Sequence, residues 1–305
     1  MGEWGSTLGL TLLRGKYVLY LKSVTERLLQ EGINMHSEKT TIRLAAVDMD
    51  GTLLHDDMSL SDFSKDIIRK AEHRGIRIVL ATGRMFDAAR PKAEELGLSD
   101  TPLICYTGAW IMMSRSGRPI WQDGIDISVA EKILLTAREK GWLVHTFFDD
   151  QIYLPEPNKT EAKYKKYRTK AVAYLGDAFY HPKKKPTRLI FADGSEAVRR
   201  EIRRVIETNF SDEVEVVFPG DDFVDVHKKG VSKGAALQKL CNMWDISLSE
   251  VIAFGNTEND VSMLKMAGIS YAVKNADKYA RSAAGSICDS NGNDGVAKVL
   301  AEYLV

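Results

Sequence analysis

Two carboxylates that follow an apolar run constrain the fold of this chain most strongly. The run Leu44-Ala45-Ala46-Val47 leads directly into Asp48-Met49-Asp50-Gly51-Thr52. A short apolar run that ends at a Gly-Thr turn is typical of a buried parallel strand, and ligands of open α/β sheets bind just beyond the carboxyl ends of such strands. Two acids at that place can share a divalent cation, or one can attack an electrophile while the other transfers a proton. A strand end with two solvated acids is the simpler alternative.

Apolar runs and helical patterns alternate on both sides of a different middle region. After the first strand we expect a helix from Ser61 to Gly75, a strand at 76–81, a helix at 86–96 and a strand at 103–106. The same alternation returns with a helix from Ser232 to about Met243, a strand at 251–254, a helix at 259–267 and a strand at 269–273. This rhythm predicts an α/β fold with a Rossmann-like, doubly wound parallel sheet as its core.

The middle region has the character of a separate α+β layer. We expect a helix at 129–140, a hairpin with strands at 143–148 and 152–154, a strand at 187–192, a helix at 195–208 and a strand at 214–218. Hairpins combined with long helices predict an inserted α/β (α+β) cap domain. The predicted division is therefore an N-terminal extension of unknown role at 1–41, a core made of 42–124 and 223–305, and a cap at 125–222.

Composition excludes several classes of protein. The chain has 305 residues, and its 42 basic and 42 acidic residues balance, so no global charge favours a nucleic-acid or membrane partner. No apolar run reaches the ~18 residues needed to span a membrane. The three cysteines are far apart, which fits a reducing compartment, and we predict a cytoplasmic location.

Polar residues follow four of the predicted strands, so a parallel sheet would bring them together. They are Asp48 and Asp50 after the first strand, Thr82 after the second, Thr107 after the third and the segment 255–260 after the late strand. Lys233 opens a helix, beside the amide groups of its first turn. Carboxylates bind a hard cation, whereas a hydroxyl, an ammonium and helix-end amides bind phosphate oxygens. Phosphoryl transfer is the chemistry that this set suits best.

In order and spacing these segments resemble the motifs of the haloacid dehalogenase-like hydrolases. The segments are Asp48-Met49-Asp50-Gly51-Thr52, Ala81-Thr82-Gly83-Arg84, Lys233-Gly234 and Gly255-Asn256-Thr257-Glu258-Asn259-Asp260. The insertion between the second and third segments, and the closing Asn293-Asp294-Gly295-Val296-Ala297, look like the Cof-type phosphatases within that family. The resemblance covers about 42–305.

The resemblance implies a role for each motif residue. Asp48 would be the nucleophile that forms an aspartyl-phosphate, and Asp50 would protonate the leaving oxygen and then activate water. Mg²⁺ would offset the repulsion between carboxylate and phosphate. The implied metal set comprises Asp48, Asp50, Asn256 and Asp260, with Asp50 contributing its backbone carbonyl. The implied phosphate-binding set comprises Thr82, Gly83, Lys233 and Asn259.

The sequence departs from the family pattern at two places. Asn256 stands where the family usually has a metal-binding Asp, so we expect weaker metal binding, with Asp260 carrying more of it. Thr107 stands where the subfamily tends to have Asn. Asp50, by contrast, is typical of phosphatases and phosphomutases, whereas the related ion-pumping ATPases have Thr there.

The sequence thus predicts a Mg²⁺-dependent phosphatase of small phosphorylated metabolites, such as sugar phosphates. A sugar phosphomutase and a weakly active regulator that binds phosphometabolites remain alternatives. Arg84 is predicted to be structural. Ten basic residues between Lys159 and Arg188, among them Lys163, Lys165 and Lys166, form either a solvated face of the cap or a patch that attracts anionic substrates. The oligomeric state is not predicted.

Overall fold

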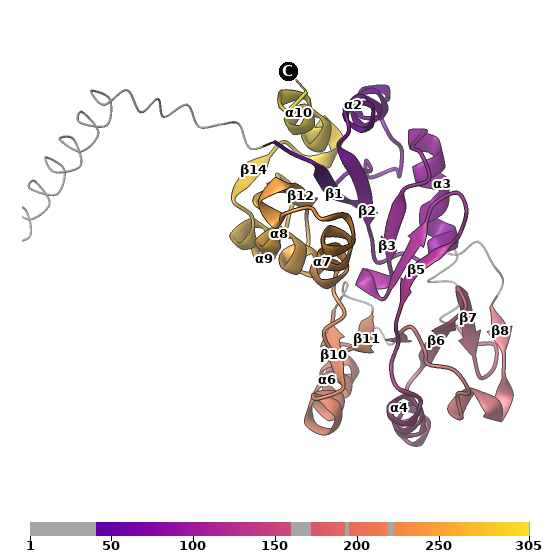
Figure 1. The fold of residues 1–305 in the computed structure, drawn as a ribbon. Coiled ribbons are helices and arrows are strands. Elements are labelled where there is room, and N and C mark those ends of the chain that lie inside the picture. The colour runs from indigo at the N-terminus through magenta and orange to yellow at the C-terminus, as the bar shows by residue number, and fades with distance from the viewer. Residues whose placement is uncertain (1–40, 160–171, 193–194, 219–222, 305) are drawn as a thin grey trace, which may run out of the picture. The chain divides into compact units, whose positions relative to one another are not determined.

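The computed structural model describes residues 41–159, 172–192, 195–218 and 223–304. Residues 42–305 form one compact unit, which Figure 1 shows as a ribbon. The predicted N-terminal extension, apart from Thr41, lies outside the described residues.

Eight strands form the first sheet, and its central part is parallel (Figure 1). Strands β14 to β3 run parallel to one another, and β4 and β5 add an antiparallel edge. In order across the sheet the strands are β14 (Ser286–Cys288), β13 (Ile269–Val273), β12 (Val251–Gly255), β1 (Leu44–Asp48), β2 (Arg77–Ala81), β3 (Pro102–Cys105), β4 (Trp110–Met113) and β5 (Pro119–Gln122). The predicted α/β class with a Rossmann-like parallel core is confirmed. The β4–β5 hairpin was not predicted.

Helices of this part form two packed groups. In one, α2 (Asp62–His73) contacts α10 (Gly295–Glu302) and α3 (Phe86–Leu96). In the other, α7 (Lys233–Trp244) contacts α8 (Val261–Met266), which contacts α9 (Lys278–Ala283). Predicted caps set several boundaries. The Ser61 hydroxyl accepts a hydrogen bond from the amide of Ser64 at 2.9 Å, and Gly97 ends α3 with a left-handed φ of 71°.

The second sheet has six strands and is mostly antiparallel. In order across it they are β10 (Val214–Val217), β11 (Val224–Lys228), β9 (Leu189–Phe191), β6 (Val144–Phe148), β7 (Gln151–Leu154) and β8 (Ala173–Tyr174). Two helices, α4 (Ile127–Lys140) and α6 (Glu196–Phe210), share a separate hydrophobic cluster with it. Since β11 pairs with β9 and β10, this sheet extends to Lys228, beyond the predicted cap boundary at residue 222.

Short 3₁₀ helices complete the described elements. They span Tyr106–Gly108, Gly176–Tyr180, Leu248–Glu250, Glu258–Asp260 and Asn291–Asn293. The first bends the chain after β3, where Thr107 has a left-handed φ of 56°. A Cβ on Gly108 would lie 2.2 Å from the carbonyl oxygen of Ser232, so only glycine lets this turn touch the start of α7.

One side chain of the second sheet caps a helix of the first. Asp150 lies in the β6–β7 turn, and its carboxylate accepts hydrogen bonds from the amides of Phe86 and Asp87 at 2.9 and 2.8 Å. The Tyr106 hydroxyl donates to the same carboxylate at 2.7 Å. These bonds satisfy amides at the first turn of α3 and join the two sheets.

Replacing Asp150 by Ala should therefore destabilise the fold. The change leaves buried donors without an acceptor, and we expect a loss of about 1–3 kcal/mol in the free energy of unfolding, measured by urea denaturation. Asp149→Ala is the matched control, because Asp149 lies in the same turn but is exposed and pairs with Lys184 on the surface. Equal losses in the two variants would contradict this role.

Candidate functional site

The strand ends that the sequence predicts to converge surround one cavity. Asp48 ends β1, and the loops that carry Gly83, Thr107 and Asn256 follow β2, β3 and β12, which are neighbours in the parallel part of the sheet. The cavity has a volume of about 270 Å³. Residues lining it from the first-sheet side include Asp48, Asp50, Gly83, Arg84, Thr107, Asn256 and Asn259.

Lys233 lies beneath this cavity as a buried cation. It is 0% exposed, and its ammonium donates to Oδ1 of Asp48 and to Oδ1 of Asp260, each at 2.6 Å. A buried ammonium is stable only when it is paired in this way. Its place is set by Ser232, whose hydroxyl accepts from the amide of Ala235 at the start of α7. Lys233 is therefore not a solvated helix start.

Asp48 keeps one oxygen unpartnered. Its side chain is buried, and Oδ2 has no hydrogen-bond partner among the described residues. Burial raises the pKa of Asp48 from 3.8 to about 7; repulsion by Asp260 adds to this, and Lys233 opposes it. A buried carboxylate oxygen without a partner costs about 1–3 kcal/mol. A cation at Oδ2 would offset that cost, so the site fits the ion that the sequence predicts.

Asp50 is held by Arg84, which we predicted to be structural. The guanidinium donates from Nε to Oδ2 at 2.8 Å and from Nη2 to Oδ1 at 2.5 Å, which is a bidentate pair. Both residues line the cavity. Arg84 thus lies inside the site and controls where the Asp50 carboxylate points.

Asp260 contacts the lysine and its own loop with its two carboxylate oxygens. It is fully buried and is not among the residues that line the cavity. Its Oδ2 accepts from the amides of Asn256 and Thr257 at 2.9 and 3.0 Å, while Oδ1 accepts from Lys233. Three of the carboxylate's four acceptor positions therefore hold the loop and the lysine, and one position on Oδ1 is left for a cation.

Asn256 and Asn259 reach the cavity from the same loop. The side-chain amide of Asn256 lies against Gly51. A Cβ added at Gly51 would be 2.5 Å from Nδ2 of Asn256, and Gly51 has a left-handed φ of 73°, so a glycine suits this close approach. Asn259 accepts from the Thr257 hydroxyl at 2.8 Å. The side chain of Asn256 thus contacts Gly51, the residue that follows Asp50 in the chain.

Thr82 is buried behind the cavity wall. Its hydroxyl accepts from the amide of Arg84 at 3.1 Å, and Gly83 lines the cavity in its place. The Thr82 hydroxyl hydrogen remains available as a donor. The predicted phosphate-binding residues thus lie near one another, but only Gly83 and Asn259 line the cavity.

Side chains of the second sheet form the opposite wall. They are Phe147, Ile152, Arg188, Ile190, Phe223 and Asp225. Motif analysis missed Arg188 and Asp225, because they lie in no motif and their pairing depends on the register of β9 and β11. Their separation of 37 residues gives no local signal.

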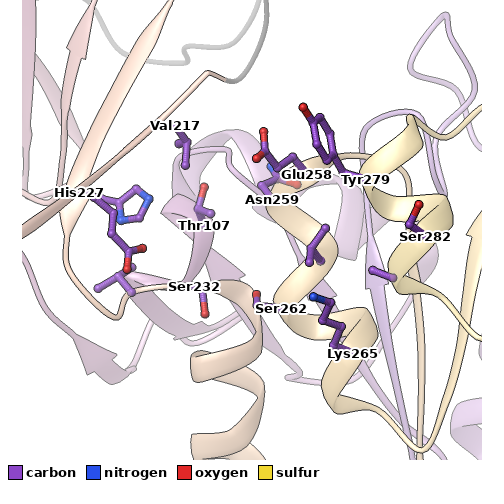
Figure 2. A pocket seen from close by; sticks show the side chains of 14 residues that line it. Thr107, Val217, His227, Ser232, Glu258, Asn259, Ser262, Lys265, Tyr279 and Ser282 are labelled. Atoms are coloured by element: carbon purple, nitrogen blue, oxygen red, sulfur yellow. The ribbon is translucent and has the colours of Figure 1, made fainter. Parts of the chain in front are cut away.

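A second pocket, of about 470 Å³, borders the first. Thr107 and Asn259 line both pockets. Figure 2 shows Val217 and His227 facing Glu258, Asn259 and Tyr279 across it, with Thr107 between them. His227 is buried, and its Nδ1 lies 3.2 Å from the carbonyl oxygen of its neighbour Lys228.

Further observations concern metal-binding clusters, membrane-spanning helices and the basic segment. In the described ranges, no group of three or more His, Cys, Asp or Glu side chains is arranged to hold a metal ion. The same ranges contain no helix with the length and apolar character required to cross a membrane. Of the basic segment, Lys163, Lys165 and Lys166 lie outside the described residues, whereas Lys184 and Lys185 form surface ion pairs with Asp149 and Asp126.

The raised pKa of Asp48 predicts a pH-dependent stability. A carboxyl whose pKa is about 7 when folded and 3.8 when unfolded favours the folded state below pH 3.8. That contribution is lost as the pH rises through 7. Without divalent cations at pH 8, Asp48→Asn should therefore melt about 2–4 °C or more above the unmodified protein, and the gain should shrink toward pH 4.

Melting temperatures measured from pH 4 to pH 9 check this prediction. Asp177→Asn provides the same chemical change at a side chain that is 85% exposed, so its melting temperature should follow that of the unmodified protein at every pH. A gain for Asp48→Asn that does not vary with pH would contradict the assignment.

Comparison with known proteins agrees with this geometry. A family model described as haloacid dehalogenase-like hydrolase matches residues 45–300. The Bacillus subtilis protein named 5-amino-6-(5-phospho-D-ribitylamino)uracil phosphatase YcsE is 27% identical over 274 residues, covering 90% of this chain and 100% of that protein. Escherichia coli pyridoxal phosphate phosphatase YbhA is 26% identical, with coverages of 87% and 100%.

Solved structures give the same result for the fold. The crystal structure of TM0651 from Thermotoga maritima has a TM-score of 0.77 at 25% identity, and the match covers 86% of this chain and 97% of that one.

Proposed function

We propose that this chain, which belongs to the haloacid dehalogenase-like hydrolases, is a Mg²⁺-dependent phosphatase acting through an aspartyl-phosphate on Asp48. Its relatives include proteins named as phosphatases, and the chain is a phosphoric monoester hydrolase. Members of this family generally use a divalent metal ion. The observation that carries the proposal is the unpartnered Oδ2 of Asp48, a buried residue that lines the same cavity as Asp50.

Asp48 is suited to nucleophilic attack because its two oxygens differ. Lys233 holds Oδ1 at 2.6 Å and fixes the carboxylate, which leaves Oδ2 to form a bond with phosphorus. The bond from phosphorus to the leaving oxygen breaks in the same step. Asp50, after turning from Arg84 and taking up a proton from water, donates that proton to the leaving oxygen. The resulting carboxylate later removes a proton from the water that cleaves the aspartyl-phosphate.

The transferred phosphoryl group needs donors in the cavity. The ammonium of Lys233 has three N–H groups, of which the bonds to Asp48 and Asp260 use two. The third, together with the Gly83 amide, the Thr82 hydroxyl and the Asn259 amide, would hold phosphoryl oxygens.

The metal site would use Asp48, the backbone carbonyl of Asp50 and the side-chain oxygen of Asn256. Bound there, Mg²⁺ would supply positive charge that offsets the repulsion between the carboxylate and the phosphate. Asp260 would act indirectly, since it fixes the loop of Asn256 through two backbone amides.

Small phosphorylated metabolites are the proposed substrates. The relatives described above bear the names of phosphatases of a ribitylaminouracil phosphate and of pyridoxal phosphate. The cavity of about 270 Å³ lies just below the range of ~300–1,000 Å³ for pockets of drug-sized ligands, as expected for a small ester. Sugar phosphates belong to the same size class. The proposed partners are accordingly small phosphate esters and neither a nucleic acid nor a membrane.

Phosphate release from a panel of phosphate esters tests the function. The unmodified protein should release phosphate only with Mg²⁺, and Asp48→Asn should lower kcat by roughly 10³-fold or more. Asp50→Asn should lower it by roughly 10²–10⁴-fold. Asp177→Asn, a surface carboxamide change, should leave kcat unaltered.

The alternatives predict other results in the same assay. Interconversion of sugar phosphate isomers without free phosphate would mean a phosphomutase. Ester binding without any turnover would mean a regulator. Phosphate release that persists in Asp48→Asn would contradict the aspartyl-phosphate.

Replacing Asn256 by Asp should strengthen metal binding. A carboxylate adds a negative charge at the proposed cation site, and the Mg²⁺ concentration for half-maximal phosphate release should fall about tenfold. Titrations of activity and of melting temperature with Mg²⁺ measure this change. Asn242→Asp on the exposed face of α7 is the matched control, and an equal shift there would remove Asn256 from the metal site.

A further inference from the structure

An ion pair of the second sheet faces the site without completing its hydrogen bonds. Arg188 precedes β9 and Asp225 lies in the neighbouring strand β11, and their side chains are only 11% and 4% exposed. Nη1 of Arg188 donates to Oδ2 of Asp225 at 3.3 Å and to the carbonyl of Gly83 at 2.9 Å. The pair is thus anchored to the loop after β2, on the rim of the cavity that holds Asp48.

Each member of the pair keeps one buried polar atom unused. Nε of Arg188 and Oδ1 of Asp225 have no hydrogen-bond partner among the described residues. Buried polar atoms are nearly always satisfied, so these two indicate a missing ligand or water. One is a donor and the other an acceptor, and both belong to residues that line the cavity.

The surrounding wall is apolar and partly aromatic. Phe147, Ile152 and Ile190 line the cavity beside the pair. The guanidinium of Arg188 lies over the rings of Tyr106 and Phe147, with its carbon 5.0 and 4.7 Å from their centroids. These contacts hold the guanidinium plane in a fixed orientation.

This combination favours a flat ring over a polyhydroxylated chain. An open sugar chain would bring many hydroxyl groups to apolar side chains that cannot pair with them, which is costly. A planar heterocycle can pack its faces against Phe147, Ile152 and Ile190. When the two side chains turn toward the ring, a donor and an acceptor on its edge can pair with the buried atoms Oδ1 of Asp225 and Nε of Arg188.

We propose that Arg188 and Asp225 are specificity-determining residues that bind the leaving group, and that the preferred substrates are phosphate monoesters of a planar, hydrogen-bonding heterocycle. This inference rests on the proposed function, since the phosphoryl group must sit at Asp48 while the ring lies against the second sheet.

Kinetics with three esters test the pair. Pyridoxine 5′-phosphate carries a heterocycle with donors and acceptors, p-nitrophenyl phosphate has a flat ring without a donor, and glycerol 3-phosphate has no ring. Asp225→Asn should raise KM for pyridoxine 5′-phosphate about tenfold or more, with kcat little changed. KM for p-nitrophenyl phosphate and glycerol 3-phosphate should stay within about twofold. Asp177→Asn should change none of these values.

A binding measurement separates this inference from the proposed function. Calorimetry should detect pyridoxine, which has no phosphate, binding to the unmodified protein, and Asp225→Asn should abolish that binding. Arg188→Lys serves as the second variant, because it keeps the charge but loses Nε, and it should weaken pyridoxine binding in the same way.

The outcomes distinguish the two ideas. No binding of pyridoxine to the unmodified protein, or equal changes in KM for all three esters, would overturn the role of the pair even if phosphate is released. Pyridoxine binding that depends on Asp225, without phosphate release from any ester, would uphold the pair and overturn the phosphatase.

Discussion

A single buried ammonium organises the site. Lys233 lies between Asp48 and Asp260. Asp48 keeps its second oxygen without a partner among the described residues, and Asp260 holds the amides of Asn256 and Thr257. Without the cation, two buried carboxylates would repel each other in a medium of low polarity. The lysine therefore connects the end of β1 with the loop after β12 by pairing with one carboxylate of each.

Sequence alone predicts the parts of this structure that local rules control. Ser61 and Ser232 begin helices where the capping pattern indicates, Gly97 ends a helix, and the apolar run before Asp48 forms a buried parallel strand. Parallel strands then bring their polar ends to one edge of the sheet. The order of strands and polar residues in the sequence is therefore enough to predict that Asp48, Gly83 and Asn256 lie close together.

Other parts depend on partners that are distant in the sequence. Nothing local shows that Arg84 reaches Asp50, 34 residues away. Likewise, no motif shows that Asp260 accepts hydrogen bonds from Lys233 and from two backbone amides. The strand Val224–Lys228 joins the second sheet because it pairs with β9 and β10, and no local pattern shows this pairing.

The contact of Asp150 with α3 bears on how the enzyme would exchange its ligands. If the β6–β7 turn withdraws, water takes over the amides of Phe86 and Asp87 and the hydroxyl of Tyr106, and the carboxylate is hydrated in return. Such an exchange costs only a few kcal/mol, about 1–3 for each bond, because water replaces the protein partners of every group. The turn can thus act as a reversible latch: its directional bonds align the two sheets when they meet, and the moderate cost lets them separate when a product has to leave.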